Sequence, residues 1–130
     1  AEGGRPDSPI GRLIHDTLSA RIHPKQACEA LSAAFQAQGG RIARKGAAQG
    51  QVLWATGVAG LHELNTDLGQ EVGGAMLGPW PGRRGHFIAN GGFKIGFGMA
   101  PKVAEVMADL MLDRVDDIPD EFRVAASLKL

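Results

Sequence analysis

The sequence predicts an α/β protein in which short parallel strands pair and helices pack on them. Two short apolar runs, 51–57 and 86–90, each end at glycine and are too short for helices, so we interpret them as buried strands. Apolar residues at helical spacing predict helices over 24–38, 60–68 and 101–112. Strands that alternate with helices favour parallel pairing with the helices packed on the sheet.

The helices have recognisable start and stop signals. Pro24 suits the first turn of a helix, and Gly39-Gly40 is placed to end that helix in the C-cap position. Pro101 is expected to open the last helix, and Ser8-Pro9 marks a further helix start near the N-terminus. The alanine-rich helix that follows Pro24 is the best defined of the first half.

The length predicts one domain. With 130 residues and 13.7 kDa, the chain has the size of a single compact domain, which we expect to cover 1–130. We expect loose tails at 1–7 and 121–130, the latter with weak strand character. Glycines and two prolines crowd 69–85, and this composition predicts a loop.

Composition excludes several classes of protein. Hydrophobic residues make up 44% and charged residues 22% of the chain, which is ordinary for a globular protein and argues against disorder. Lys+Arg and Asp+Glu are both 14, so no overall charge favours nucleic acid or anionic lipid. No apolar run approaches the ~18 residues of a membrane span. Cys28 is the single cysteine, so it forms no internal disulfide, and we expect a cytoplasmic protein with Cys28 packed in the core.

The segment 86–112 holds the strongest local signal for a binding site. A strand is followed by a glycine-rich turn over 91–98 and then by a helix. The first turn of a helix presents unpaired N–H groups, and glycines there let an anionic or carbonyl-bearing ligand approach them. Lys94 lies within the turn and adds a charge. The alternative interpretation is a tight turn with a solvated lysine.

A second signal is Ala55-Thr56-Gly57, at the end of the other strand. Ligands of open α/β sheets bind beyond the carboxyl ends of the strands, so two such ends in one chain support each other. The alternative is an ordinary turn from strand to loop. The histidine spacings match no metal site, and we expect the four histidines to be capping or surface residues.

Three segments show a resemblance to a known family. The first is Arg21-Ile-His-Pro24 with its following helix and Gly39-Gly-Arg-Ile42, and the second is Val52-Leu-Trp-Ala-Thr-Gly57. The third, and the most specific, is 81–98 with Gly-Phe-Lys-Ile-Gly-Phe-Gly at its end. Together they resemble the FAD-dependent oxidoreductases of the D-amino-acid oxidase, glycine oxidase and sarcosine oxidase family.

The resemblance implies a partial FAD-binding, Rossmann-like domain and FAD as the cofactor. By resemblance, Lys94 is the catalytic residue, lying near the flavin and pairing with a substrate carboxylate. Backbone N–H groups at the start of the last helix would stabilise negative charge on the reduced flavin. The residues placed at the cofactor are Thr56, Gly57, Gly92, Phe93, Gly96, Phe97, Gly98 and Met99.

The chain also departs from that family. The G-x-G-x-x-G fingerprint that would hold the FAD pyrophosphate is absent, and 69–85 stands where a substrate domain would be. The chain therefore resembles the middle and C-terminal parts of a flavin-binding domain. We expect it to bind FAD weakly and to be inactive alone.

Three functions stay open at this point. The leading one is an FAD-dependent oxidoreductase, or a fragment of one, that oxidises a small amine or amino acid by hydride transfer to flavin. The second is a non-catalytic α/β interaction module that self-associates or pairs with a missing N-terminal half. The third is a small domain that binds an anion at 92–99. We expect a homo-oligomer, because two short strands leave helix faces uncovered. We expect no nucleic-acid or membrane partner.

Overall fold

The structure, a computed structural model, divides into two units, Ala1–Gly46 and Ala47–Leu130, and each is described by itself. The expected tail 1–7 and the helix expected after Ser8 lie outside the described residues. A membrane-crossing helix, long and apolar enough to span a bilayer, is not found in the described part of the chain. The described residues are 11, 22–69, 74–92 and 95–128.

The N-terminal unit contains one described helix, α1 (Pro24–Ala37), which confirms the helix predicted to begin at Pro24. His23 caps it, because its Nδ1 accepts a hydrogen bond from the Gln26 N–H at 3.4 Å. This agrees with a capping role for histidine. The expectation that Cys28 packs in a core is wrong: α1 buries none of its residues, and Cys28 is exposed.

The C-terminal unit is built on a three-stranded sheet, with strand order β1-β3-β2. β1 (Val52–Trp54) pairs in parallel with β3 (His86–Asn90), and β2 (Met76–Pro79) pairs with β3 in antiparallel orientation. Both predicted strands and their parallel pairing are therefore confirmed. The sheet as a whole is mixed rather than parallel.

β2 corrects the prediction that 69–85 is a loop. Met76–Pro79 forms a strand there, with Met76 and Leu77 buried. The segment contains Gly78 at φ 124° and ends in proline, and it shows no alternation of apolar and polar residues. Its strand state comes from hydrogen bonding to β3, which local composition does not reveal.

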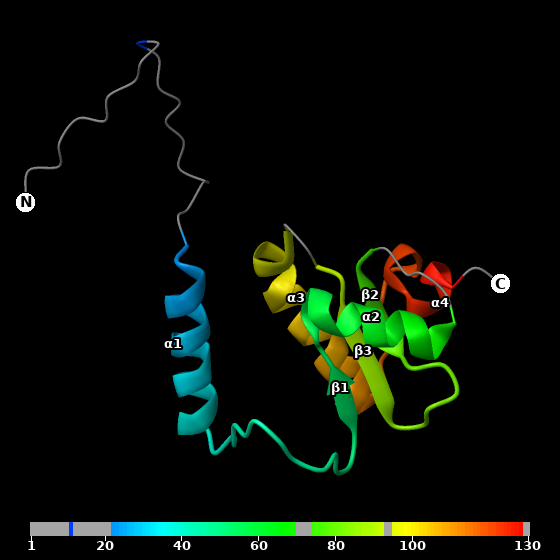
Figure 1. Ribbon diagram of the computed structural model, residues 1–130, viewed down its shortest axis with the longest axis horizontal. Helices are drawn as coiled ribbons and strands as arrows, with labels where there is room; N and C mark the ends of the chain where they lie inside the picture. The colour runs from blue at the N-terminus through cyan, green and yellow to red at the C-terminus, as the bar shows by residue number, and fades with distance from the viewer. Residues whose placement is uncertain (1–10, 12–21, 70–73, 93–94, 129–130) are drawn as a thin grey trace, which may run out of the picture. The chain divides into compact units, whose positions relative to one another are not determined.

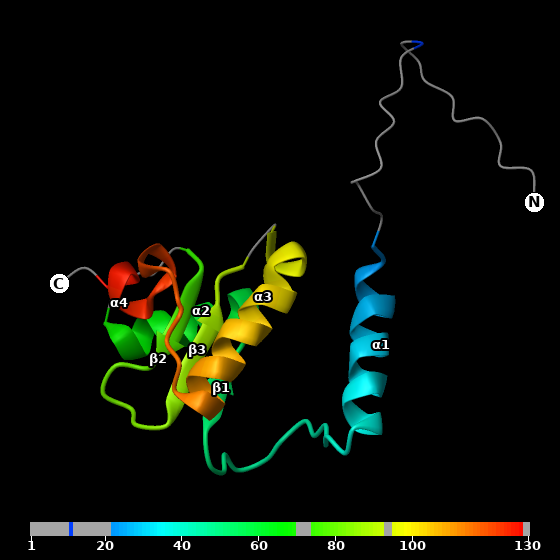
Figure 2. The ribbon, with the colours of Figure 1, turned by 180° about the vertical axis from the view of Figure 1, so that it is seen from behind.

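Helices cover both faces of the sheet and make three layers. Figures 1 and 2 show α2 (Gly57–Leu68) on one face and α3 (Gly96–Ala108) on the other. The core divides in the same way. The buried cluster on the α2 side consists of Leu64, Met76, Trp80, Ile88 and Val124. The buried cluster on the α3 side consists of Leu77, Val106, Met107 and Ile118.

α3 begins earlier than its proline predicted. The helix starts at Gly96, so Pro101 lies inside it and the last residues of the expected 91–98 turn are helical. Glycine and proline both disfavour helix locally, but Val106 and Met107 of the same helix are buried in the core and offset that cost. The helix continues into a π-helical turn, Asp109–Asp113.

Residues 120–128 pack against β2, which corrects the expected loose tail for the described part of 121–130. A 3₁₀ turn, Asp120–Phe122, leads into the short helix α4 (Val124–Ser127). Val124 is only 2% exposed. Weak strand character was predicted for this segment. The structure has a single isolated β-bridge there, in which Arg123 pairs with Leu77 at the outer side of β2.

Candidate functional site

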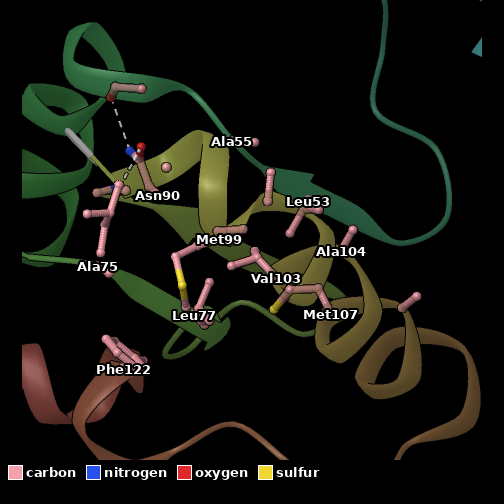
Figure 3. A pocket seen from close by; sticks show the side chains of 18 of the residues that line it. Leu53, Ala55, Ala75, Leu77, Asn90, Met99, Val103, Ala104, Met107 and Phe122 are labelled. Carbon is pink, nitrogen blue, oxygen red and sulfur yellow. Dashed lines mark hydrogen bonds between the residues drawn. The ribbon is translucent and has the colours of Figure 1, made fainter. Parts of the chain in front are cut away.

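A pocket of about 650 Å³ lies between α3 and the sheet in the C-terminal unit. Its walls come from the strands, from the segments that follow β1 and β3, and from most of the length of α3 (Figure 3). Leu53, Leu77, Val103 and Met107 are among its apolar lining residues. None of the described residues that line it is charged. The pocket therefore suits an apolar, uncharged group of ligand size.

The parallel pairing of β1 and β3 brings two strand ends together at this pocket. Trp54 lies opposite Ile88 in the register, so the segments that follow the two strands leave the sheet at the same edge. Gly57 from the first segment and Gly92 from the second both line the pocket. This is the carboxyl-end position at which α/β sheets bind their ligands.

Asn90 joins the two strand ends by hydrogen bonds. It is buried, with 8% of its surface exposed. Its Nδ2 donates to Thr56 Oγ1 at 3.3 Å and to the Gly57 carbonyl at 3.2 Å, and its Oδ1 accepts from the Gly91 N–H at 2.9 Å. Figure 3 shows Asn90 at the end of β3 with two of these bonds dashed. The side chain fixes the backbone that forms this pocket wall.

Glycines shape the wall in two different ways. Gly91 has φ 78°, and a Cβ there would collide with the carbonyl oxygen of Gly74, so this glycine is required by the fold itself. Gly57 and Gly96 line the pocket, and a Cβ on either would meet no atom within 4 Å. Gly57 has φ 62°, which by itself favours glycine, whereas Gly96 has no such requirement and simply leaves open space beside the backbone.

The first turn of α3 adds hydrogen-bond donors next to this wall. Gly96 and Met99 line the pocket, and the N-cap residue Ile95 has no side chain that can accept from the first N–H groups. The N-terminus of a helix has a partial positive charge and free N–H groups. A carbonyl or a developing negative charge on a ligand could be stabilised there.

Aromatic contacts hold β1 in place from the opposite face of the sheet. Trp54 Nε1 donates to His86 Nδ1 at 3.0 Å, and the Trp54 and Trp80 rings meet edge to face with centroids 5.5 Å apart. The Arg83 guanidinium lies 4.4 Å from the Trp80 ring centroid and pairs with Asp67 at 2.9 Å. These contacts connect the strand that carries Leu53 to the β2–β3 hairpin and to α2.

An ion pair fixes the segment that supplies the Phe122 side of the pocket. Arg123 Nη1 donates to both carboxylate oxygens of Asp116, at 2.9 and 2.7 Å, and Arg123 Nε donates to Asp120 at 2.9 Å. The Arg123 guanidinium holds the pKa of the Asp116 carboxyl below its usual range, and the Ile118 N–H, which also donates to that carboxylate, lowers it further. The pair thus positions buried Ile118 together with Phe122.

The predicted site residues fall into three groups. Gly57, Gly92, Gly96 and Met99 line the pocket together. Thr56, Phe97 and Gly98 are described but do not line it. Thr56 instead accepts from Asn90, and Phe97 is 45% exposed. Phe93 and Lys94 lie outside the described residues.

Sequence reasoning missed Asn90. The signal was present, because Asn90 shares the face of β3 that carries buried Ile88 and stands immediately before two glycines. A polar residue on a buried face needs hydrogen-bond partners. Because Trp54 lies opposite Ile88 in the parallel register, the residues that follow β1 are the expected partners of Asn90.

Fold and site together define a small α/β unit with an apolar, glycine-lined pocket at the carboxyl ends of two parallel strands. No family model, curated protein or solved structure matches the chain. Within the described residues, no three His, Cys, Asp or Glu side chains gather in a way that could hold a metal ion.

Proposed function

We propose that the chain is an FAD-dependent oxidoreductase, or a fragment of one, that acts on an amine or amino acid, with the pocket between α3 and the sheet holding the flavin ring. The observation that supports this most is the wall formed by Gly57, which begins α2, and Gly96, which begins α3: both line the pocket, and a Cβ on either would meet no atom within 4 Å. A planar ring can lie directly against such a backbone wall.

The chemistry of the lining fits the ring of the cofactor. The described lining residues are uncharged and almost all apolar, as an aromatic ring system requires. The N–H groups of the first α3 turn, where Gly96 and Met99 line the pocket, can stabilise negative charge. When bound, flavin accepts a hydride from the carbon that bears the substrate nitrogen.

The residues of this chain would position the ring and polarise it. Asn90 holds the backbone of Thr56 and Gly57, so that wall stays in place. The backbone at Gly96 would donate toward an electron-rich edge of the ring. Lys94 is proposed, from its place in the sequence motif alone, to pair with the carboxylate of an amino-acid substrate.

The remainder of FAD has fewer contacts available. The sequence contains no G-x-G-x-x-G turn to hold a pyrophosphate at a helix N-terminus. The binding free energy should therefore come from the ring. Riboflavin, which has the ring without the phosphates, should bind with nearly the same affinity as FAD.

Equilibrium dialysis of the full chain against riboflavin and FAD tests the proposal. We expect weak binding of both, with dissociation constants above ~1 μM. The Gly96→Ala variant should weaken binding by about tenfold or more, because the methyl group enters space that the ring would occupy. Gly98→Ala is the matched control, since Gly98 is in the same helical turn and does not line the pocket.

Three results would count against the proposal. The first is that neither flavin binds at millimolar concentration. The second is that Gly96→Ala binds flavin like the wild type. The third is that Gly96→Ala and Gly98→Ala weaken binding equally, which would mean that the effect belongs to the helix rather than to the pocket. Submicromolar FAD binding together with weak riboflavin binding would instead show that the phosphates have a site on this chain.

A further inference from the structure

A histidine holds β1 through its side chain. Trp54 Nε1 donates to His86 Nδ1 at 3.0 Å, across the parallel pair of β1 and β3. Within the described residues this is the only side-chain hydrogen bond that β1 makes. The two ring planes are 19° apart, with their centroids 5.9 Å apart. Because a neutral imidazole accepts at one nitrogen and carries its hydrogen on the other, this bond places the hydrogen of His86 on Nε2.

Protonation of His86 removes the acceptor. An imidazolium donates from both nitrogens and accepts at neither, so a proton taken up at Nδ1 faces the indole N–H of Trp54. Two donors then oppose each other, and the hydrogen bond is lost. Histidine side chains ordinarily take up this proton near pH ~6.5, so the change falls in a range that a cell can reach.

The charges around His86 leave this hydrogen bond as the deciding interaction. β1 and β2 carry no charged residue. Arg83 of the β2–β3 turn and Asp67 of α2 pair at 2.9 Å, so their opposite charges offset each other. The other titratable or charged side chains described on α2 and on the turn are exposed, namely His62, Glu63 and Arg84.

β1 is short, and it leads into the pocket wall. It has three residues, and within the described part of the chain it pairs only with β3. The Val52 N–H donates to the Gly85 carbonyl at 3.0 Å in this pairing. Shortly after Trp54 the chain reaches Gly57, which lines the pocket and accepts from Asn90. The contact that holds Trp54 therefore also holds the start of this wall.

We propose that His86 and Trp54 form a pH-sensitive switch that controls β1. In the neutral state, His86 accepts the indole N–H, and β1 is held against β3. As the pH falls, His86 takes up one proton at Nδ1, the indole N–H loses its partner, and β1 loosens together with the wall that follows it. Loss of one hydrogen bond should raise the opening equilibrium of β1 about three- to tenfold. This inference does not depend on the flavin proposal.

NMR spectroscopy of the full chain between about pH 8 and pH 5 tests the switch. The Trp54 indole N–H signal, assigned by its absence in Trp54→Phe, should move with the same midpoint as the His86 Cε1–H signal. Over this range the hydrogen-exchange protection factor of the Val52 amide should fall about three- to tenfold. The Trp80 amide is the internal control, because it donates to the His86 carbonyl at 2.8 Å and involves no part of β1. Its protection factor should stay constant.

Two variants separate His86 from the general response of the protein to pH. His86→Gln keeps an oxygen acceptor but has no group that titrates in this range, so the indole signal and the protection of Val52 should become independent of pH. His62→Gln is the matched control, because His62 is exposed on α2. It should respond to pH like the wild type.

Four results would overturn the proposal. They are a wild-type indole signal that stays constant while His86 titrates, and a His86 that does not titrate above about pH 5. Equal loss of protection at Val52 and Trp80 would assign the response to general unfolding. A response that persists in folded His86→Gln would assign it to another group. The first three results come from the wild type alone, so they decide the question even if His86→Gln fails to fold.

Discussion

Replacing Asn90 by alanine should destabilise the C-terminal unit more than any other single polar substitution at the site. The side chain makes three hydrogen bonds, to Thr56, Gly57 and Gly91, and is 8% exposed. A net hydrogen bond contributes ~0.5–1.5 kcal/mol, so the free energy of unfolding should fall by about 3 kcal/mol. For a unit of this size the melting temperature should then drop by roughly 12–24 °C.

Thermal unfolding followed by circular dichroism measures this change. Gln51→Ala is the control, because Gln51 is exposed and lies just before β1. Its free energy of unfolding should stay within ~0.5 kcal/mol of the wild type. A double-mutant cycle with Thr56→Val isolates the Asn90–Thr56 bond, for which we expect a coupling energy of ~0.5–1.5 kcal/mol.

The outcome that refutes this reasoning is a melting temperature of Asn90→Ala that matches the Gln51→Ala control. Asn90 would then not connect the two strand ends, and the position of the Gly57 wall would need another cause. A large loss of stability with zero coupling to Thr56 would assign the effect to the Gly57 and Gly91 bonds alone.

Three further substitutions test the surrounding structure. Gly91→Ala should lower the free energy of unfolding, measured by urea titration, by ~2 kcal/mol or more, because φ is 78° and the new Cβ meets the Gly74 carbonyl. Gly74→Ala is the control. Its Cβ would meet no atom within 4 Å, so its free energy of unfolding should be nearly that of the wild type. Trp54→Phe removes the donor to His86 and should cost about 1 kcal/mol in the same titration; no change would mean that this bond is absent in solution. Asp116→Asn should lower the melting temperature at pH 7. Arg123 lowers the pKa of the Asp116 carboxyl in the folded protein. The ionised carboxylate therefore stabilises the fold above the ordinary pKa of ~3.9, and this stabilisation is lost as the pH falls through the lower folded value. The melting temperatures of the wild type and of Asp116→Asn should accordingly converge in strong acid.

Local sequence predicted the elements whose signals are self-contained. β3 was predicted at 86–90 and is observed as His86–Asn90. A five-residue apolar run with glycine on both sides is too short for a helix, so a strand is the expected structure. α1 was predicted from Pro24 and Gly39-Gly40 and ends at Ala37. The parallel pairing of β1 and β3 followed from the helix between them and is confirmed by the register.

The features that sequence reasoning missed depend on distant partners. Met76–Pro79 is a strand because β3 supplies its hydrogen bonds, despite a glycine and a proline that argue against it. α3 begins at Gly96 rather than Pro101 because later residues of the helix pack on the sheet. Two of the three hydrogen-bond partners of Asn90, Thr56 and Gly57, lie more than thirty positions earlier in the chain, and only the strand register brings them to it.

The pocket and the open edge of β1 have one origin, because α3 covers the β2 side of the sheet and leaves β1 exposed. The flavin ring would lie against Gly96 of α3, which lines this pocket together with Leu53 of β1. Gly96→Ala should therefore weaken riboflavin binding by about tenfold, because the new methyl group enters the space beside the backbone that the ring would fill. A riboflavin affinity equal to that of the wild type would show that the ring does not lie against Gly96.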